Sequence, residues 1–399
     1  MSSSAPHEAV DPDDTLRLLR DLVRIDSVNP SLVEGAAGEA EIAAYVAGEL
    51  RETGLEVETR EATPGRVSVV GRLRGSEGAG PKFMLNAHTD TVGVEGMEDP
   101  FSAELRDGRV YGRGAYDMKG ALAACMGAAK ALADAGAPFP GELLVTAVAD
   151  EEHSSVGTAD VLTDYSADAA VVTEPTGLDI CTAHKGFAWL EVETAGRAAH
   201  GSQFQVGRDA NMRMGRVLAR LEELEREVRS REPHPLLGPP SLHAPLVRGG
   251  TGISTYAERC TLRVERRTVP GETGEQVEAE VREILDELRA AGDFEASLET
   301  LLVRNPFEVE EDAPVVRTLE ASAERVLGTV PEHVGENPWM DSALLADAGI
   351  ETAVLGPAGD GAHAEEEWVD VESVVELARI LADAACRYCG GSRGSAPRG

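Results

Sequence analysis

The chain contains the run Glu142-Leu-Leu-Val-Thr-Ala-Val-Ala-Asp-Glu-Glu152, in which an apolar segment ends in three consecutive acids. The apolar part has the composition of a buried β-strand. Burying carboxylates at its tip costs stability, because each one loses its hydration. A metal site uses such acids, since one carboxylate binds the ion while its neighbour handles a proton. The run therefore predicts a strand with a metal site at its carboxyl end, provided that the chain supplies the other ligands.

The first half of the chain alternates strand-like and helix-like segments. Helices are expected over residues 15–25, 39–53 and 119–135, and strands over residues 54–60, 66–73, 82–87, 142–149 and 169–173. This alternation indicates an α/β domain in which helices cover a central, mostly parallel sheet. A further short strand at 352–355 precedes a glycine-rich loop that ends at His363.

The pattern changes near Lys185 and changes back after residue 302. Between these points, helical spacing occurs over 209–228 and 274–291, and strand-like patterns occur over 187–194, 241–248, 253–269 and 294–302. The order β-α-β-β-α-β is that of a ferredoxin-like α+β unit. We therefore expect two domains, a catalytic α/β domain formed by residues 1–183 and 303–399 and an inserted domain formed by residues 184–302.

Composition limits the partners and the compartment. The 399 residues include 71 acids against 37 bases, and the net charge of −34 repels nucleic acid and anionic membranes. The first fifteen residues lack the apolar core of a secretory signal, and no apolar run reaches the length of a membrane span. Five scattered cysteines fit a reducing compartment better than a disulfide framework. We expect a cytoplasmic protein that binds neither nucleic acid nor membrane.

Acids and histidines gather where the predicted strands end or where a helix begins. Each cluster alone is a weak signal, since a His-x-Asp step is often a surface pair and a Glu-Glu step often starts a solvated helix. Ligands of open α/β sheets bind beyond the carboxyl ends of the strands, so all of these side chains could converge on one edge. The clusters are His88-Thr-Asp90, Asp117, Asp150-Glu-Glu152, Glu174 and His363.

These residue types suit two zinc ions. His, Asp and Glu are zinc ligands, and paired metals that share a carboxylate lie roughly 3.5–4 Å apart. The expected ligands are His88, Asp117, Glu152, Glu174 and His363. With neutral histidines these ligands carry three negative charges against the four positive charges of the two ions, and a bound hydroxide makes the centre neutral. Glu151 is then left as the general base. Asp90, two residues after His88, is expected to accept the imidazole N–H and orient the ring.

The same residues carry a resemblance to a known family. The chain resembles the co-catalytic zinc amidohydrolases, in order, through His88-Thr-Asp90, Gly112-Arg-Gly-Ala-Tyr-Asp117-Met-Lys-Gly120, Asp150-Glu-Glu152, Thr173-Glu-Pro-Thr176 and Gly361-Ala-His363. That family includes acetylornithine deacetylase, succinyl-diaminopimelate desuccinylase, aminoacylase and carboxypeptidase G. The resemblance implies a homodimer whose inserted domain is both lid and dimerisation domain. It also implies two Zn²⁺ ions, for which Co²⁺ or Mn²⁺ can substitute.

The resemblance also implies individual roles. Asp117 would bridge the two ions and be followed by a cis peptide bond, and Glu151 would be the base. One ion would be held by His88 and Glu174, and the other by Glu152 and His363. In the inserted domain, His200 corresponds to a histidine that reaches across the dimer to stabilise the oxyanion, and Arg266 to an arginine that grips the substrate carboxylate.

The resulting hypothesis is a zinc-dependent hydrolase of amino-acid metabolism that cleaves the amide bond of an N-acyl amino acid, as acetylornithine deacetylase does. A metal-bound hydroxide would attack the acyl carbonyl, and Glu151 would pass the proton to the leaving amine. The alternative within the family is a dipeptidase or carboxypeptidase that acts on short peptides. Two alternatives from other classes, a metal-free binding protein and a structural module, conflict with the filled ligand positions and with the cost of burying acids.

Overall fold

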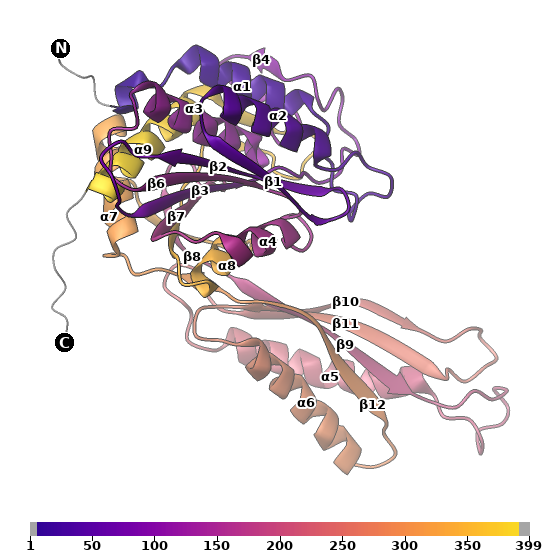
Figure 1. The fold of residues 1–399 in the computed structure, drawn as a ribbon. Coiled ribbons are helices and arrows are strands. Elements are labelled where there is room, and N and C mark those ends of the chain that lie inside the picture. The colour runs from indigo at the N-terminus through magenta and orange to yellow at the C-terminus, as the bar shows by residue number, and fades with distance from the viewer. Residues whose placement is uncertain (1–5, 391–399) are drawn as a thin grey trace. The chain divides into compact units, whose positions relative to one another are not determined.

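The computed structural model describes residues 6–390 and divides the chain into two compact units (Figure 1). Unit 1 comprises the chain up to Thr182, Val309–Val334 and the chain from Met340 onward, and unit 2 comprises Ala183–Glu308 and Gly335–Trp339. The predicted insertion, residues 184–302, falls inside unit 2. The predicted catalytic domain begins and ends with residues 1–5 and 391–399, which lie outside the described residues.

The largest sheet has nine strands in the order β1-β2-β6-β3-β7-β15-β8-β13, with β14 paired to β8. The four central strands β6, β3, β7 and β15 are parallel, whereas the pairs β1–β2, β2–β6, β15–β8 and β8–β13 are antiparallel. The sheet is therefore mixed, and only its centre matches the expected parallel arrangement. The strands are β1 (Glu56–Thr63), β2 (Arg66–Arg74), β3 (Lys82–His88), β6 (Glu142–Val148), β7 (Ala169–Val172), β8 (Ile180–His184), β13 (Phe307–Glu308), β14 (His333–Glu336) and β15 (Glu351–Val354).

The central strands form because their side chains are apolar on both faces. Every residue after the first is buried in β3 and β6, and all four residues of β7 are buried. Parallel strands covered on both faces have such continuous apolar runs. Their shared direction places the carboxyl ends of β6, β3, β7 and β15 at one edge of the sheet.

Helices cover both faces of this sheet (Figure 1). One face carries α1 (Pro12–Arg24), α2 (Ala40–Glu52), α3 (Gly120–Asp134) and α9 (Val371–Gly390), with α7 (Pro314–Leu327) packed on α9; the other carries α4 (Val156–Asp164) and α8 (Ser342–Asp347). The short 3-10 helix η1 (Pro6–Ala9) contacts α3 and α9. Because α3 packs against the sheet, α1 and α9, it is apolar and buried nearly all round. This helix directly follows the π-helical turn η2 (Ala115–Lys119) and so anchors it.

A small antiparallel sheet in unit 1 joins two distant parts of the chain. Its order is β16-β17-β5-β4, and its strands are β4 (Glu104–Arg106), β5 (Arg109–Tyr111), β16 (Gly359–Asp360) and β17 (Trp368–Asp370). The pairing of β5 with β17 places Tyr111 opposite Trp368. The segment that leads into η2 therefore lies beside the segment that follows His363.

Unit 2 has the element order β-α-β-β-α-β. Its antiparallel sheet runs β10-β11-β9-β12, and both helices pack on this sheet. Side-chain caps begin both helices, since Asp209 accepts the N–H of Asn211, and Thr273 and Gln276 form a capping box. The elements are β9 (Gly186–Ala195), α5 (Ala210–Arg229), β10 (Ser241–Gly249), β11 (Arg259–Thr268), α6 (Gly274–Ala290) and β12 (Ala296–Arg304).

Within residues 6–390, no helix combines the length and the apolar character needed to cross a membrane.

None of the five cysteines, all of which lie in the described part of the chain, forms a disulfide bond in this structure. Cys386 and Cys389 lie in α9, and burial raises the pKa of each thiol to about 12, which makes both poor thiolates at neutral pH.

Candidate metal centre

Five predicted ligands meet at the carboxyl edge of the parallel strands in unit 1. His88 is the last residue of β3, and the acidic run begins at Asp150, two residues beyond β6. Glu174 lies two residues beyond β7, Asp117 lies in η2, and His363 lies in the loop after β16. The peptide bond between Asp117 and Met118 is cis.

Asp117 lies between the two histidines. Its Oδ1 is 3.1 Å from His88 Nε2, and its Oδ2 is 3.2 Å from His363 Nε2. His88 Nε2 is also 3.7 Å from an oxygen of Glu174, and His363 Nε2 is 3.2 Å from Glu152 Oε2. The side chains thus form two groups that share the Asp117 carboxylate, the groups that the family resemblance implies, and their role as metal ligands stays a prediction.

The same atoms could hold a metal ion. The ligand atoms of His88, Asp117 and Glu152 all lie within 4.8 Å of one another, and so do those of His88, Glu151 and Glu174. Glu152 Oε1 is buried and has no hydrogen-bond partner among the described residues. A buried carboxylate oxygen without a donor is costly, and a divalent cation would satisfy it. The donor set of carboxylates and imidazoles therefore fits a metal ion of the zinc type.

The pKa values of the site reflect crowded negative charge. Burial, followed by the neighbouring Glu174, raises the pKa of Glu151 well above its usual range, and burial raises the pKa of Glu174 to about 8. Hydrogen bonds to Asp117 and Glu152 raise the pKa of His363 to about 10. Without metal ions, the crowded carboxylates of Glu151 and Glu174 thus favour their protonated forms. Bound cations would replace those protons and reverse the shifts of the acids.

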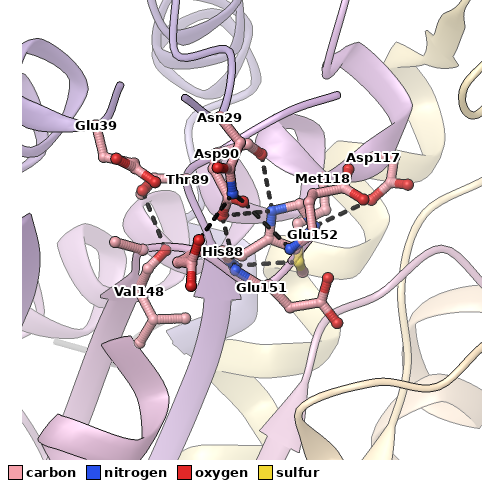
Figure 2. Close-up of polar contacts among 12 residues, drawn as sticks. Asn29, Glu39, His88, Thr89, Asp90, Asp117, Met118, Val148, Glu151 and Glu152 are labelled. Carbon is pink, nitrogen blue, oxygen red and sulfur yellow. Dashed lines mark hydrogen bonds and ion pairs between the residues drawn. The ribbon is translucent and has the colours of Figure 1, made fainter. Parts of the chain in front are cut away.

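Asp90 has a different partner from the one expected (Figure 2). His88 Nδ1 lies 2.9 Å from the main-chain carbonyl oxygen of Asp90, whereas the Asp90 carboxylate is 3.6 Å away. That carboxylate accepts the main-chain N–H groups of Glu151 and Glu152 at 3.0 and 3.2 Å. The ring of His88 is therefore oriented by the backbone of residue 90, and the side chain of Asp90 holds the acidic run after β6.

Behind Asp90 lies a buried polar network that sequence reasoning missed. Asn29 Nδ2 donates to Asp90 Oδ2 at 2.8 Å (Figure 2). It also donates to Asp150 Oδ1 at 3.1 Å. Arg66 donates to Asn29 Oδ1 at 2.7 Å and to Glu39 at 2.5 Å. These residues come from segments before the first ligand, and no spacing in the sequence links them to it. The network fixes the segment that carries Glu151.

Another buried acid, Asp341, directly precedes α8. Its side chain is buried and accepts the hydroxyl of Thr158 at 2.5 Å, and burial raises its pKa to about 6. Its negative charge contributes to the raised pKa values of Glu151 and Glu174. The sequence offers only a Pro-Trp-Met-Asp segment here, with no strand pattern before it.

The two remaining predicted site residues belong to unit 2. His200 is exposed, and its Nδ1 lies 2.9 Å from Ser202 Oγ. Arg266 is fully buried, and its guanidinium donates to both carboxylate oxygens of Glu272 at 2.5 and 3.2 Å. Arg267, on the opposite face of β11, has a half-buried side chain. The oxyanion role of His200 stays a prediction. Because Glu272 already accepts from the guanidinium of Arg266, the structure does not favour Arg266 as the residue that binds the substrate carboxylate.

Two curated relatives are similar to nearly the whole chain. Acetylornithine deacetylase from Myxococcus xanthus is 31% identical, over 95% of this chain and 99% of its own. N-formyl-4-amino-5-aminomethyl-2-methylpyrimidine deformylase from Bacillus subtilis is 28% identical, over 87% of this chain and 89% of its own. Among solved structures, the aminopeptidase PepT from Bacillus cereus has a TM-score of 0.78 at 18% identity, covering 96% of this chain and 99% of its own, and shares the fold.

A family model for the peptidase family M20/M25/M40 matches residues 84–387, a range that begins in β3 and ends in α9. The matched range includes all of the ligand groups described above and the whole of unit 2. The chain therefore belongs to the peptidase family M20/M25/M40 and is a metal-dependent hydrolase of the group that comprises deacylases and peptidases.

Proposed function

We propose that this protein hydrolyses the amide bond of an N-acyl amino acid and that it uses two Zn²⁺ ions to do so. One observation carries the proposal: the two oxygens of Asp117 face different histidines, His88 and His363, at 3.1 and 3.2 Å. A carboxylate in that position can bridge two ions. Glu174 would complete the ligands of the first ion, and Glu152 those of the second.

The residues around the ligands have separate tasks in this proposal. When bound, the ions would supply an activated water and polarise the acyl carbonyl. Glu151 takes the proton from the water and delivers it to the leaving nitrogen, and the Asp90 carboxylate holds the main chain of Glu151 for that task. We assign His200, in a homodimer, to the oxyanion. Because Glu272 accepts from both terminal nitrogens of Arg266, we assign the substrate carboxylate to the neighbouring Arg267.

The relatives favour the removal of an acyl group over the cleavage of a peptide, and acetylornithine deacetylase favours an amino acid as the acylated amine. The two curated relatives are named for the removal of an acetyl group and of a formyl group. The aminopeptidase is similar at only 18% identity, which supports the fold and not the substrate. A dipeptidase or carboxypeptidase is therefore the second candidate.

Amine release by the zinc-loaded protein tests the proposal. The panel contains N-acetylornithine, N-succinyl-diaminopimelate, several N-acetyl and N-formyl amino acids, and several dipeptides. We expect one acyl amino acid to be preferred strongly over every dipeptide. Release from dipeptides alone would make the protein a peptidase. Silence across the whole panel, with zinc bound, would reject the proposed substrate class.

A further inference from the structure

Glu367 is a buried acid that neither the ligand set nor the proposed chemistry uses. It lies four residues after His363 and directly before β17. Only 1% of the residue is exposed. Burying a carboxylate is unfavourable unless donors replace the lost water, so its partners indicate what it is for.

Four donors surround this carboxylate. Oε2 accepts from Arg113 Nη1 at 2.7 Å and from the main-chain N–H of Gly114 at 3.0 Å. Oε1 accepts the main-chain N–H groups of Tyr116 and Asp117 at 2.9 and 3.0 Å. Successive N–H groups that point at one anion form a concave anion-binding turn. The anion in this turn is the side chain of Glu367, and the turn carries Asp117.

The turn has a backbone that few residues could adopt. Gly114 has a φ of 77°, and a Cβ at this position would lie 2.6 Å from Thr91 Cγ2. Glycine therefore allows the chain to wrap closely around the Glu367 carboxylate. The same turn ends at α3, whose burial fixes its other end.

Arg113 extends the contact to the loop of the second histidine. Its Nη2 donates to the carbonyl oxygen of Ala364, the residue after His363, at 2.9 Å. Its Nε donates to the carbonyl oxygen of Gly93, also at 2.9 Å. A guanidinium fixed at three points is a rigid connector, because its donors lie in one plane. The segment of Asp117 and the loop of His363 are thereby joined through one buried ion pair.

We propose that Glu367 is a positioning residue of the metal centre: its carboxylate holds Asp117, and through Arg113 the His363 loop, in the arrangement that two metal ions require. This inference rests on the proposed ligand set. A ligand that is already in place loses less conformational freedom when the metal binds. The hydrogen bonds of Glu367 therefore raise the affinity for metal. Glu367 itself touches neither substrate nor metal.

The test is Zn²⁺ binding by the full-length protein after chelator treatment, measured by calorimetry, for wild type and Glu367→Gln. The glutamine has the same shape, but its amide NH₂ would face donors of the turn where a carboxylate oxygen now accepts. We expect the affinity for at least one Zn²⁺ to fall about 10–100-fold, the effect typical of residues that orient metal ligands. Turnover should recover in part with excess Zn²⁺.

The matched control is Asp383→Asn. Asp383, in α9, is also a buried acid, 5% exposed, and it pairs with His7 of η1 and Arg387 of α9, neither of which lies in a ligand segment. We expect both variants to lower the melting temperature and only Glu367→Gln to weaken Zn²⁺ binding. If both variants bind Zn²⁺ as wild type does, Glu367 is merely structural and the inference is overturned.

Two further outcomes are separable. If Glu367→Gln does not fold, Arg113→Lys takes its place, because lysine keeps the charge and loses the planar connection between Glu367 and Ala364; unchanged Zn²⁺ affinity in that variant overturns the inference. If wild type itself binds no Zn²⁺, the proposed ligand set fails, and this inference fails with it. Weakened binding in the variants beside tight binding in wild type supports both.

Discussion

The carboxylate of Asp90 accepts the main-chain N–H of Glu151 at 3.0 Å, so the residue expected to orient a histidine instead holds the proposed base. The second oxygen of Asp90 accepts from Glu152 at 3.2 Å. Asp90 therefore couples the base and a metal ligand to β3, the strand that supplies His88. Asn29 Nδ2 donates to the same carboxylate and so helps to fix its orientation.

Asp90→Asn should separate the two possible tasks of this side chain. Asparagine has one acceptor where the carboxylate has two, so the main chain of Glu151 and Glu152 loses a partner, while the carbonyl oxygen that faces His88 Nδ1 remains. We expect kcat at saturating Zn²⁺ to fall about 10–100-fold, with a smaller change in Zn²⁺ affinity. The exposed Asp134→Asn is the control. A normal kcat together with weakened Zn²⁺ binding would show that the Asp90 side chain orients the His88 imidazole and does not position Glu151.

Glu151→Gln should nearly abolish turnover without emptying the metal site. The amide cannot take a proton from water, and general-base catalysis contributes about 10²–10⁴ in rate. We expect kcat to fall by that factor and the zinc content, measured by elemental analysis, to stay close to that of wild type. Glu365→Gln, an exposed change in the loop of His363, should leave kcat unaltered. Near-normal turnover of Glu151→Gln would show that another group is the base.

Asp117→Asn and His363→Ala should differ in zinc stoichiometry. Asp117 faces both histidines, so its loss should weaken both ions, whereas loss of His363 should weaken only the ion shared with Glu152. Zinc also stabilises the folded protein, by about 2.7 kcal/mol at a concentration 100 times Kd. Elemental analysis and thermal melts with added Zn²⁺ measure both effects. Equal loss of one ion in both variants would contradict a bridging Asp117.

Burial of His184 should make unit 2 sensitive to acid. Burial lowers the pKa of this imidazole from 6.5 to about 4, because the charged form loses its hydration. Between about pH 6.5 and pH 4 the imidazole is therefore protonated in the unfolded chain and neutral in the folded chain. The free energy of unfolding falls as the pH drops through this range. The loss is at most about 3–4 kcal/mol, because each of the roughly 2.5 pKa units between 6.5 and about 4 corresponds to 1.36 kcal/mol.

Urea unfolding at pH 7 and at pH 4.5 measures this effect after metal removal. His184→Gln cannot take up the proton, so its stability should change less between the two pH values than that of wild type. His243→Gln, which alters an exposed histidine, should behave as wild type does. An equal pH dependence in wild type and His184→Gln would assign the acid sensitivity to other groups.

The sequence predicts the parts of the fold that have long apolar patterns. The central strands are continuous apolar runs, and their parallel order explains why acids and histidines after separate strands meet at one edge. Short strands such as β16 and β17 have too few residues for a pattern and were not predicted. The antiparallel ends of the large sheet were missed as well, because strand direction depends on pairing partners and not on local composition.

Within the site, contacts that depend on a single atom escape the sequence. The spacing of His88 and Asp90 places both on one side of an extended chain, but it cannot show whether the ring meets a carboxylate or a main-chain carbonyl. Arg66 and Asn29 come from segments with no relation in spacing to the ligands. Glu367 is one of three consecutive glutamates, Glu365–Glu367, and only packing shows which of the three is buried.

The pair Arg266 and Arg267 illustrates the same difficulty and leads to a direct experiment. Side chains alternate across a strand, so β11 buries Arg266 and leaves Arg267 half-buried on the opposite face, where its guanidinium lies 5.4 Å from the ring centre of Phe187. Removal of Arg266 would leave Glu272 without its bidentate partner, and breaking such a buried pair costs about 3–5 kcal/mol.

We therefore expect Arg266→Ala to lower the free energy of unfolding by several kcal/mol, and Arg267→Ala to leave it nearly unchanged while raising KM for a substrate that bears a carboxylate. Urea unfolding measures the first effect, and steady-state kinetics on matched substrates with and without the carboxylate measure the second. If Arg266→Ala is as stable as wild type and raises KM only for the carboxylate substrate, then Arg266 opens toward the substrate in solution. The ion pair with Glu272 would then be one of two states of that side chain, because a guanidinium cannot hold Glu272 and a substrate carboxylate with the same donors.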